Sequence, residues 1–200
     1  MSTKNKVVKL KDICTISAGR SLRGHVPEVK GTGIALVQMK DMNDDGIKWD
    51  KCMSIELGGK APARYIVEDD ILLQTKGTVN EVVLVDKTIH DTDNKLVTAP
   101  YVFIIKADNE KVLPAYLAWW LRQNPVRSYF SKNASGEKSV SIPRALIENT
   151  DIVLPSFDQQ KKVIKANEQM LMTKEKLQKL ILEQEALNLE MALDIQNNKA

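Results

Sequence analysis

The sequence predicts an α+β protein, in which a mostly-β globular domain over residues 1–155 precedes one long coiled-coil helix over residues 156–200. Three observations support this fold class. Short runs of β-branched and aromatic residues alternate with turn residues through the first part. Residues 158–196 contain neither proline nor glycine. Their apolar residues recur every three or four positions, which is the period of an amphipathic helix.

The expected strands lie in four segments of the first part. They are residues 34–38, the end of residues 65–74, residues 81–85 and residues 100–105. One helix is expected to begin at Pro114, because proline suits the first turn of a helix, and to end near Asn124. Between these limits the apolar residues follow the three- and four-residue spacing of an amphipathic helix.

The start of the long helix is marked by a capping box. Ser156 follows Pro155, and Gln159 lies three positions after Ser156. In this arrangement each of the two polar side chains bonds a backbone N–H that has no partner within the helix. A helix from Phe157 to Gln196 spans roughly 60 Å at about 1.5 Å per residue, which exceeds the width of a small domain.

A heptad seam runs along the long helix. With position a at Val163, seven of the ten a and d positions are apolar, which is the pattern of a helix that packs against another helix. A single helix cannot bury such a seam, so we expect this segment to associate with a partner helix. The predicted seam residues are Val163, Met170, Leu177, Leu180, Leu187 and Met191, with polar interruptions at Thr173, Gln184 and Asp194.

A second apolar stripe lies away from the seam. It consists of Leu182, Ala186, Leu189 and Leu193. A helix that is apolar on two sides is expected to be buried on two sides. The stripe either rests on the globular part of the same chain or docks a second protein. We favour the docking of a partner at Leu182, Leu189 and Leu193, because glutamates keep the intervening positions solvated.

The composition argues against a membrane-spanning or secreted protein and against a cysteine metal site. The hydrophobic fraction of 43% suffices for a core, and the net charge of +3 permits an anionic partner without requiring one. No apolar run approaches the ~20 residues of a membrane helix, and none follows the lysine-rich first residues as in a signal peptide. Cys14 and Cys52 lie far apart without a nearby histidine or further cysteine, so we expect reduced core thiols and no metal site. We therefore expect a cytoplasmic protein that contacts no membrane.

The sequence contains no recognisable catalytic constellation, and we expect neither an enzyme nor a cofactor. Its two histidines, His25 and His90, have no nucleophile in a recognisable setting, and no glycine-rich phosphate loop occurs. Asp12 and residues 28–30 resemble a nuclease motif, but such triplets are frequent by chance in a chain that is 28% charged. Residues 124–127 begin like a methyltransferase motif without its second proline and its aromatic residue, so they indicate a helix stop.

Three loops combine lysine or arginine with serine, threonine or asparagine, which are side chains that contact nucleic acid. Cations bind phosphates without reading sequence, whereas arginine and asparagine can also pair with guanine and adenine edges. Taken alone, each loop is more simply a solvated surface, and only the fold decides whether the three share a face. The candidate contacts are Arg20, Ser21, Arg23 and His25 in loop 19–25, Lys76, Thr78 and Asn80 in loop 74–80, and Lys132, Ser135 and Lys138 in loop 131–139.

Several segments resemble, in their order and spacing, those of one protein family. They are residues 8–19, 65–77, 116–121, 135–146 and 152–164. In the second segment Asp69 stands where the family usually has glycine, and at the last one Asp158 and Gln159 depart from the usual residues. Over nearly its whole length the chain resembles the specificity subunit of type I restriction–modification systems, as one target recognition domain with its following conserved helix.

The resemblance implies a non-enzymatic subunit that recognises a half-site in double-stranded DNA. It also implies docking to adenine-methylating modification subunits and, through them, to the restriction motor–nuclease subunit. A full-length family member has two recognition domains and two long helices packed antiparallel, whereas this chain has one of each. Because the seam needs a partner, we expect an antiparallel homodimer, in which a second copy of the chain rebuilds the full pattern.

A two-fold protein is expected to read a two-fold target, here an interrupted palindrome of two inverted half-sites. A helix of roughly 60 Å limits the separation of the half-sites to roughly 17 base pairs. Two other interpretations stay open. One is a coiled-coil scaffold without a DNA role, and the other is a fragment that guides a methyltransferase on another chain or in a lost segment.

Overall fold

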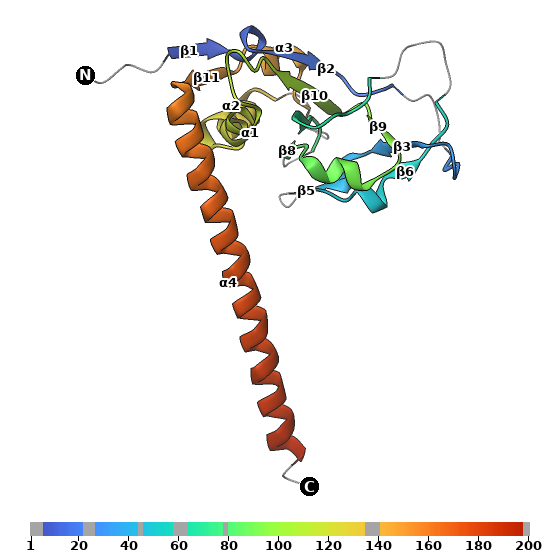
Figure 1. The fold of residues 1–200 in the computed structure, drawn as a ribbon, viewed down its shortest axis with the longest axis vertical. Coiled ribbons are helices and arrows are strands. Elements are labelled where there is room, and N and C mark those ends of the chain that lie inside the picture. The colour runs from blue at the N-terminus through green and yellow to red at the C-terminus, as the bar shows by residue number, and fades with distance from the viewer. Residues whose placement is uncertain are drawn as a thin grey trace, which may run out of the picture. The chain divides into compact units, whose positions relative to one another are not determined.

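The computed structural model describes residues 6–21, 27–43, 46–57, 64–77, 80–134 and 141–197. The chain divides into a first unit, Met1–Gln160, and a second unit, Lys161–Ala200. The first unit holds the sheets and short helices, and the second consists of the greater part of the long C-terminal helix (Figure 1). The predicted fold class, a sheet-containing domain followed by one long helix, is confirmed.

A four-stranded antiparallel sheet forms the centre of the first unit. Its strands, in order, are β2 (Cys14–Ser17), β10 (Val102–Ala107), β7 (Asp70–Gln74) and β8 (Val82–Leu84). Ile104 of β10 lies opposite Ser17 of β2 on one side and Leu72 of β7 on the other. Ile104 and Ile105 are both buried, so β10 is covered on both faces, as its continuous apolar run indicates.

A smaller sheet shares a core with the first. Its strands are β6 (Met53–Ser54), β3 (Ile34–Val37) and β9 (Lys95–Thr98). Between β3 and β6 in the sequence, β4 (Met42–Asn43) and β5 (Gly46–Ile47) form a separate two-stranded ribbon. One buried cluster contains Val37 and Leu96 of the smaller sheet together with Leu72, Val83 and Ile104 of the larger one. Each such side chain contributes about 1.5–3 kcal/mol when fully buried, so this cluster holds the two sheets together.

Short helices and a two-stranded ribbon complete the described part of the first unit. They are α1 (Pro114–Leu121), α2 (Asn124–Asn133), α3 (Arg144–Glu148) and the antiparallel pair β1 (Lys6–Lys9) and β11 (Asp151–Leu154). Short 3-10 segments lie at Leu10–Asp12, Met39–Asp41, Trp49–Lys51 and Lys87–Asp91. The Tyr116 hydroxyl donates to the Val153 carbonyl at 2.7 Å, which fixes α1 against β11.

The predicted helix at Pro114 is confirmed, but the reading of residues 124–127 as only a helix stop is wrong. α1 does end at Leu121, and Asn124 and Pro125 then form the first turn of α2. The physical reason is that proline prevents a helix from continuing and equally suits the first turn of a new one.

The backbone before β7 explains a departure from the family pattern. Asp69 has a φ of 68°, in the left-handed region that favours glycine. Aspartate is among the residues that tolerate this conformation better than most. The turn is therefore preserved although the glycine of the resembled family is replaced.

The helix α4 (Phe157–Asn197) is continuous over 41 residues, and its predicted capping box forms. The Ser156 hydroxyl accepts from the Gln159 N–H at 3.4 Å, and the Gln159 side chain accepts from the Ser156 N–H at 3.3 Å. Gln160, only 1% exposed, accepts the Leu113 N–H at 2.9 Å and donates to the Pro155 carbonyl at 3.0 Å. The first turn of α4 is thereby tied to the start of α1.

Candidate nucleic-acid interface

One end of the four-stranded sheet brings together loops from distant parts of the sequence. β10 begins at Val102, which lies opposite Gln74, the last residue of β7. β2 also ends beside the first half of β10, because Ser17 pairs with Ile104. The chain therefore leaves β2 and β7 at the same end of the sheet, and the first two predicted loops, 19–25 and 74–80, both start there.

Backbone hydrogen bonds fix these loop starts around the turn before β10. The Arg20 N–H donates to the Thr98 carbonyl at 2.8 Å. On the other side, the Thr75 N–H and hydroxyl both donate to the Tyr101 carbonyl, at 2.9 and 3.1 Å. Gly19 lies so close to this turn that a Cβ atom would be 1.8 Å from the carbonyl oxygen of Ala99. Glycine is therefore required at position 19 for the loop to approach the turn.

Lys76 and Tyr101 form a cation–π pair at this end of the sheet. The Lys76 ammonium lies 4.5 Å from the centre of the Tyr101 ring, and Tyr101 is 45% exposed. The Gln74 side chain donates to the Lys76 carbonyl at 2.8 Å, which restrains the loop that carries the lysine. A positive charge and an aromatic face are thus presented together on a restrained backbone, an arrangement suited to a phosphate and a sugar or base.

The third predicted loop returns to the same place. Residues 135–140 lie outside the described residues, but Ser141, which follows them, forms an isolated β-bridge with Lys76. The Ile142 N–H donates to the Thr75 carbonyl at 2.8 Å. Ser141 and Ile142, which follow loop 131–139, therefore pair with the start of loop 74–80, at the end of the sheet where the first two predicted loops also start.

The candidate DNA contacts differ in their exposure and in the element that carries them. Arg20 and Lys76 are partly exposed and Ser21 is exposed at the shared end. The Asn80 amide donates to the Gln74 carbonyl at 3.2 Å, so part of its hydrogen-bonding capacity holds the loop. Lys132 is exposed on α2 and does not belong to a loop. The candidates Arg23, His25, Thr78, Ser135 and Lys138 lie outside the described residues.

Tyr101 is the residue of this site that sequence reasoning missed. Residues 100–105 were predicted as one strand, but β10 begins at Val102, which leaves Tyr101 in the turn. The available signal was Pro100, because proline suits strand starts and turns and so suggests that the strand begins later. The aromatic ring is consequently exposed at the sheet end and is not packed within the sheet.

A partly buried ion pair also lies beside the sheet. The Arg64 guanidinium donates to the Ser17 hydroxyl at 2.6 Å and lies 3.6 Å from the Asp70 carboxylate. Asp70 is only 1% exposed. Burial raises the pKa of the Asp70 carboxyl, against the lowering effects of the Val67 N–H and of Arg64. Arg64 therefore serves the fold, because it compensates a buried carboxylate.

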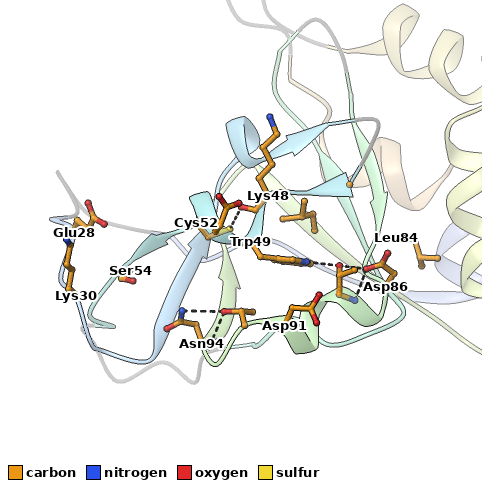
Figure 2. Close-up of a pocket in the computed structure, with 15 residues that line it drawn as sticks. Glu28, Lys30, Lys48, Trp49, Cys52, Ser54, Leu84, Asp86, Asp91 and Asn94 are labelled. Atoms are coloured by element: carbon orange, nitrogen blue, oxygen red, sulfur yellow. Dashed lines mark hydrogen bonds between the residues drawn. The ribbon is translucent and has the colours of Figure 1, made fainter. Parts of the chain in front are cut away.

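A separate hollow in the first unit is a poorer candidate for nucleic acid. Figure 2 shows it lined by Glu28, Asp86 and Asp91 with Trp49, whose indole N–H donates to the Thr88 hydroxyl at 2.9 Å. Its lining contains more carboxylates than lysines, so it repels phosphate. No group of three or more histidine, cysteine, aspartate or glutamate side chains suited to a metal ion occurs among the described residues.

The cysteines offer no reactive thiol. Cys14 and Cys52 are free and only partly buried, so they are less deeply placed than the core thiols expected from the sequence. Burial raises the pKa of each thiol to about 12. Both are therefore protonated at neutral pH and poor nucleophiles.

The helix α4 presents apolar side chains to solvent. Met170, Leu177 and Leu180 of the predicted seam are between 53% and 55% exposed, and Leu187 and Met191 are exposed as well. Val163, the first seam residue, is half-buried. Leu182, Leu189 and Leu193 of the second stripe are also exposed. None of the described helices combines the length and apolar character that crossing a membrane would require.

A protein-family comparison matches nearly the whole chain. The family model described as the type I restriction modification DNA specificity domain matches residues 3–184. No curated protein matches the chain.

Solved structures share the fold at low sequence identity. The HsdS subunit from Thermoanaerobacter tengcongensis has a TM-score of 0.59 at 15% identity, over 84% of this chain and 37% of that chain. A chain from the structure described as “Structural basis underlying complex assembly and conformational transition of the type I R-M system” has a TM-score of 0.65 at 16% identity, over 90% and 42%. The type I S subunit from M. genitalium has a TM-score of 0.53 at 10% identity, over 82% and 38%. The chain thus spans about two fifths of the length of these solved chains.

Proposed function

Because this chain belongs to the family of type I restriction–modification DNA specificity domains, we propose that it is a non-catalytic subunit that recognises a specific sequence in double-stranded DNA. One observation carries the proposal. The described starts of two polar and basic loops, and the residues that follow a third, lie at one end of a sheet beside the Lys76–Tyr101 pair, although they are far apart in the sequence. A rigid scaffold that presents variable loops is a suitable way to read base edges.

Within this interface the residues divide into two roles. Lys76 in the interface, together with Lys132 at the end of α2, binds phosphates and sets the position of the domain on the duplex, as lysines do without reading sequence. Arg20, Arg23 and Asn80 are the proposed base readers, since their side chains can pair with guanine or adenine edges. Ser21, His25, Thr78, Ser135 and Lys138 are the remaining proposed contacts.

The exposed seam of α4 supports a second proposed element, the antiparallel homodimer. Each chain would supply one recognition domain and one helix, and the pair would read an interrupted palindrome with one half-site per chain. The α4 length of 41 residues limits the half-site separation to roughly 17 base pairs. The second stripe, Leu182, Leu189 and Leu193, is the proposed docking surface for adenine methyltransferase subunits and, through them, the restriction motor–nuclease subunit. We place this assembly in the cytoplasm, where DNA and these subunits meet.

Charge reversal at Lys76 tests the DNA role. Lys76→Glu should weaken binding to a short duplex of random sequence, and the slope of log K against log salt should flatten by about 0.9 for each phosphate that the variant no longer binds. The matched control is Lys106→Glu, which reverses an exposed lysine towards the other end of β10 and should leave the slope unchanged. Equal effects of the two variants would contradict the interface.

A coiled-coil scaffold without DNA recognition is the competing function, and the exposed α4 faces are the observation that favours it. Fluorescence anisotropy titration of a labelled duplex at several salt concentrations separates the two functions. A scaffold would show no salt-dependent duplex binding in the wild type, and Lys76→Glu would change nothing.

A further inference from the structure

The charges of α4 are distributed unevenly along its length. Residues 161–180 carry six lysines against two glutamates, whereas residues 181–197 carry four acidic residues and neither lysine nor arginine. Two parallel copies would place like charges side by side along the whole helix. Two antiparallel copies would place the basic half of each helix beside the acidic half of the other, which opposite charges favour.

The polar interruptions of the seam restrict the pairing further. In an antiparallel pair, the a positions of one helix face the d positions of the other. Thr173 is a d position and Gln184 an a position, and Gln184 would be costly opposite an apolar residue because its amide would be buried without a partner. The Thr173 hydroxyl already donates to the Gln169 carbonyl at 2.8 Å, which leaves its oxygen free to accept from a glutamine amide.

Resting on the homodimer proposed above, we infer that two α4 helices pair antiparallel in one register, with the two-fold axis between residues 178 and 179. In this register Thr173 faces Gln184 of the partner, so the two interior polar interruptions meet. The apolar layers then pair Leu177 with Leu180, Met170 with Leu187, and Ala166 with Met191. These residues are exposed in the single chain, and pairing buries them against one another.

The g positions that flank the seam favour the same register. Lys176 lies beside Glu183 of the partner, and this pair occurs twice by symmetry. Glu183 forms an exposed ion pair with Lys179 of its own helix, at 3.8 Å. A shift by one heptad in one direction would place Lys176 beside its own copy. The opposite shift would place Glu183 beside its own copy, so both shifted registers replace attraction with repulsion.

Both shifted registers mismatch the interior of the seam, whereas the proposed register leaves only the terminal layer, Val163 opposite Asp194, unmatched. In one, Thr173 faces Leu177 and Gln184 faces Ala166. In the other, Thr173 faces Met191 and Gln184 faces Leu180. Each shifted register therefore buries the Gln184 amide against an apolar side chain and separates it from the Thr173 hydroxyl. The proposed register therefore sets the separation of the two helix N-termini, to which the two recognition domains are joined.

Disulfide trapping in the full chain tests the register directly. In a Cys14→Ser, Cys52→Ser background, Thr173→Cys with Gln184→Cys should give a covalent dimer on mild oxidation, because facing positions meet the short Cα separation that a disulfide needs. The control pairs report the shifted registers: Thr173→Cys with Leu177→Cys, and Thr173→Cys with Met191→Cys. Thr173→Cys alone reports a parallel pair, since that residue would then face its own copy.

The outcomes of the disulfide trapping distinguish the proposed register from the alternatives. Trapping of only the first pair supports the register. Preferential trapping of either control pair, or of Thr173→Cys alone, overturns it and leaves the DNA-recognition proposal standing if the protein still sediments as a dimer. A monomer in sedimentation equilibrium would overturn the homodimer itself, and with it the register.

Charge exchange supplies a second measurement. Lys176→Glu should weaken dimerisation roughly tenfold, because two ion pairs of modest strength become two repulsive pairs. Adding Glu183→Lys in the same chain should restore the dissociation constant to near its wild-type value. An additive loss in the double variant would contradict the pairing of these two positions.

Discussion

Gln160 offers a quantitative test of how the first turn of α4 is held. Its side chain is 1% exposed and makes two hydrogen bonds, with the Leu113 N–H at 2.9 Å and the Pro155 carbonyl at 3.0 Å. Gln160→Leu keeps a similar volume but leaves both backbone groups buried without a partner. Each such group costs about 1–3 kcal/mol, so the free energy of unfolding should fall by about 2–6 kcal/mol.

Urea unfolding followed by tryptophan fluorescence is a suitable assay, because Trp119 and Trp120 lie on α1, which begins beside Leu113. The matched control is Gln159→Leu, which removes only the exposed capping-box contact and should cost about 1 kcal/mol or less. If Gln160→Leu is no less stable than Gln159→Leu, the hydrogen bonds of Gln160 do not hold the junction and the reasoning is refuted.

Three further predictions concern the backbone, pH and the seam. Asp69→Ala should destabilise the protein by about 1 kcal/mol relative to Asp69→Gly in thermal unfolding, because Asp69 has a φ of 68°, which alanine tolerates poorly. Burial raises the pKa of Asp70, so its folded form binds a proton more tightly and its contribution to stability falls as pH rises above about 4. The free energy of unfolding of wild type should therefore fall relative to that of Asp70→Asn as pH rises from 4 to 7, as measured by urea titrations. If the difference between the two free energies does not change with pH, the raised pKa is contradicted. Leu177→Glu with Leu180→Glu should give monomers in sedimentation equilibrium, because charge buried at the seam costs several kcal/mol; a persisting dimer would refute the seam.

Local sequence signals predicted the elements whose causes are local. The Ser156–Gln159 capping box depends on four consecutive residues, and it forms as predicted. The strands β3, β8 and β10 lie within a few residues of the predicted runs, because continuous β-branched stretches favour extended backbone wherever they pair. α2 was missed because a proline that ends one helix can also begin the next.

The candidate interface depends on strand pairings that no local signal specifies. Loops 19–25 and 74–80 start at the same end of the sheet because β10 pairs with both β2 and β7, and these strands are far apart in the sequence. The charges and polar residues of the loops could be read from the sequence, but their shared location could not. Tyr101 was missed for a related reason, since the exact start of β10 is set by its partners and not by its own composition.

The central claim is that this chain reads a two-fold DNA sequence, and a selection from random duplexes tests it most directly. The tagged full chain would be captured from extract of its native cells, so that partner subunits remain bound, and the enriched duplexes would be sequenced. The account predicts an interrupted palindrome with one fixed gap, in which the half-sites are separated by less than roughly 17 base pairs. Enrichment of a non-palindromic site, or no enrichment by a protein that still sediments as a dimer, would contradict it.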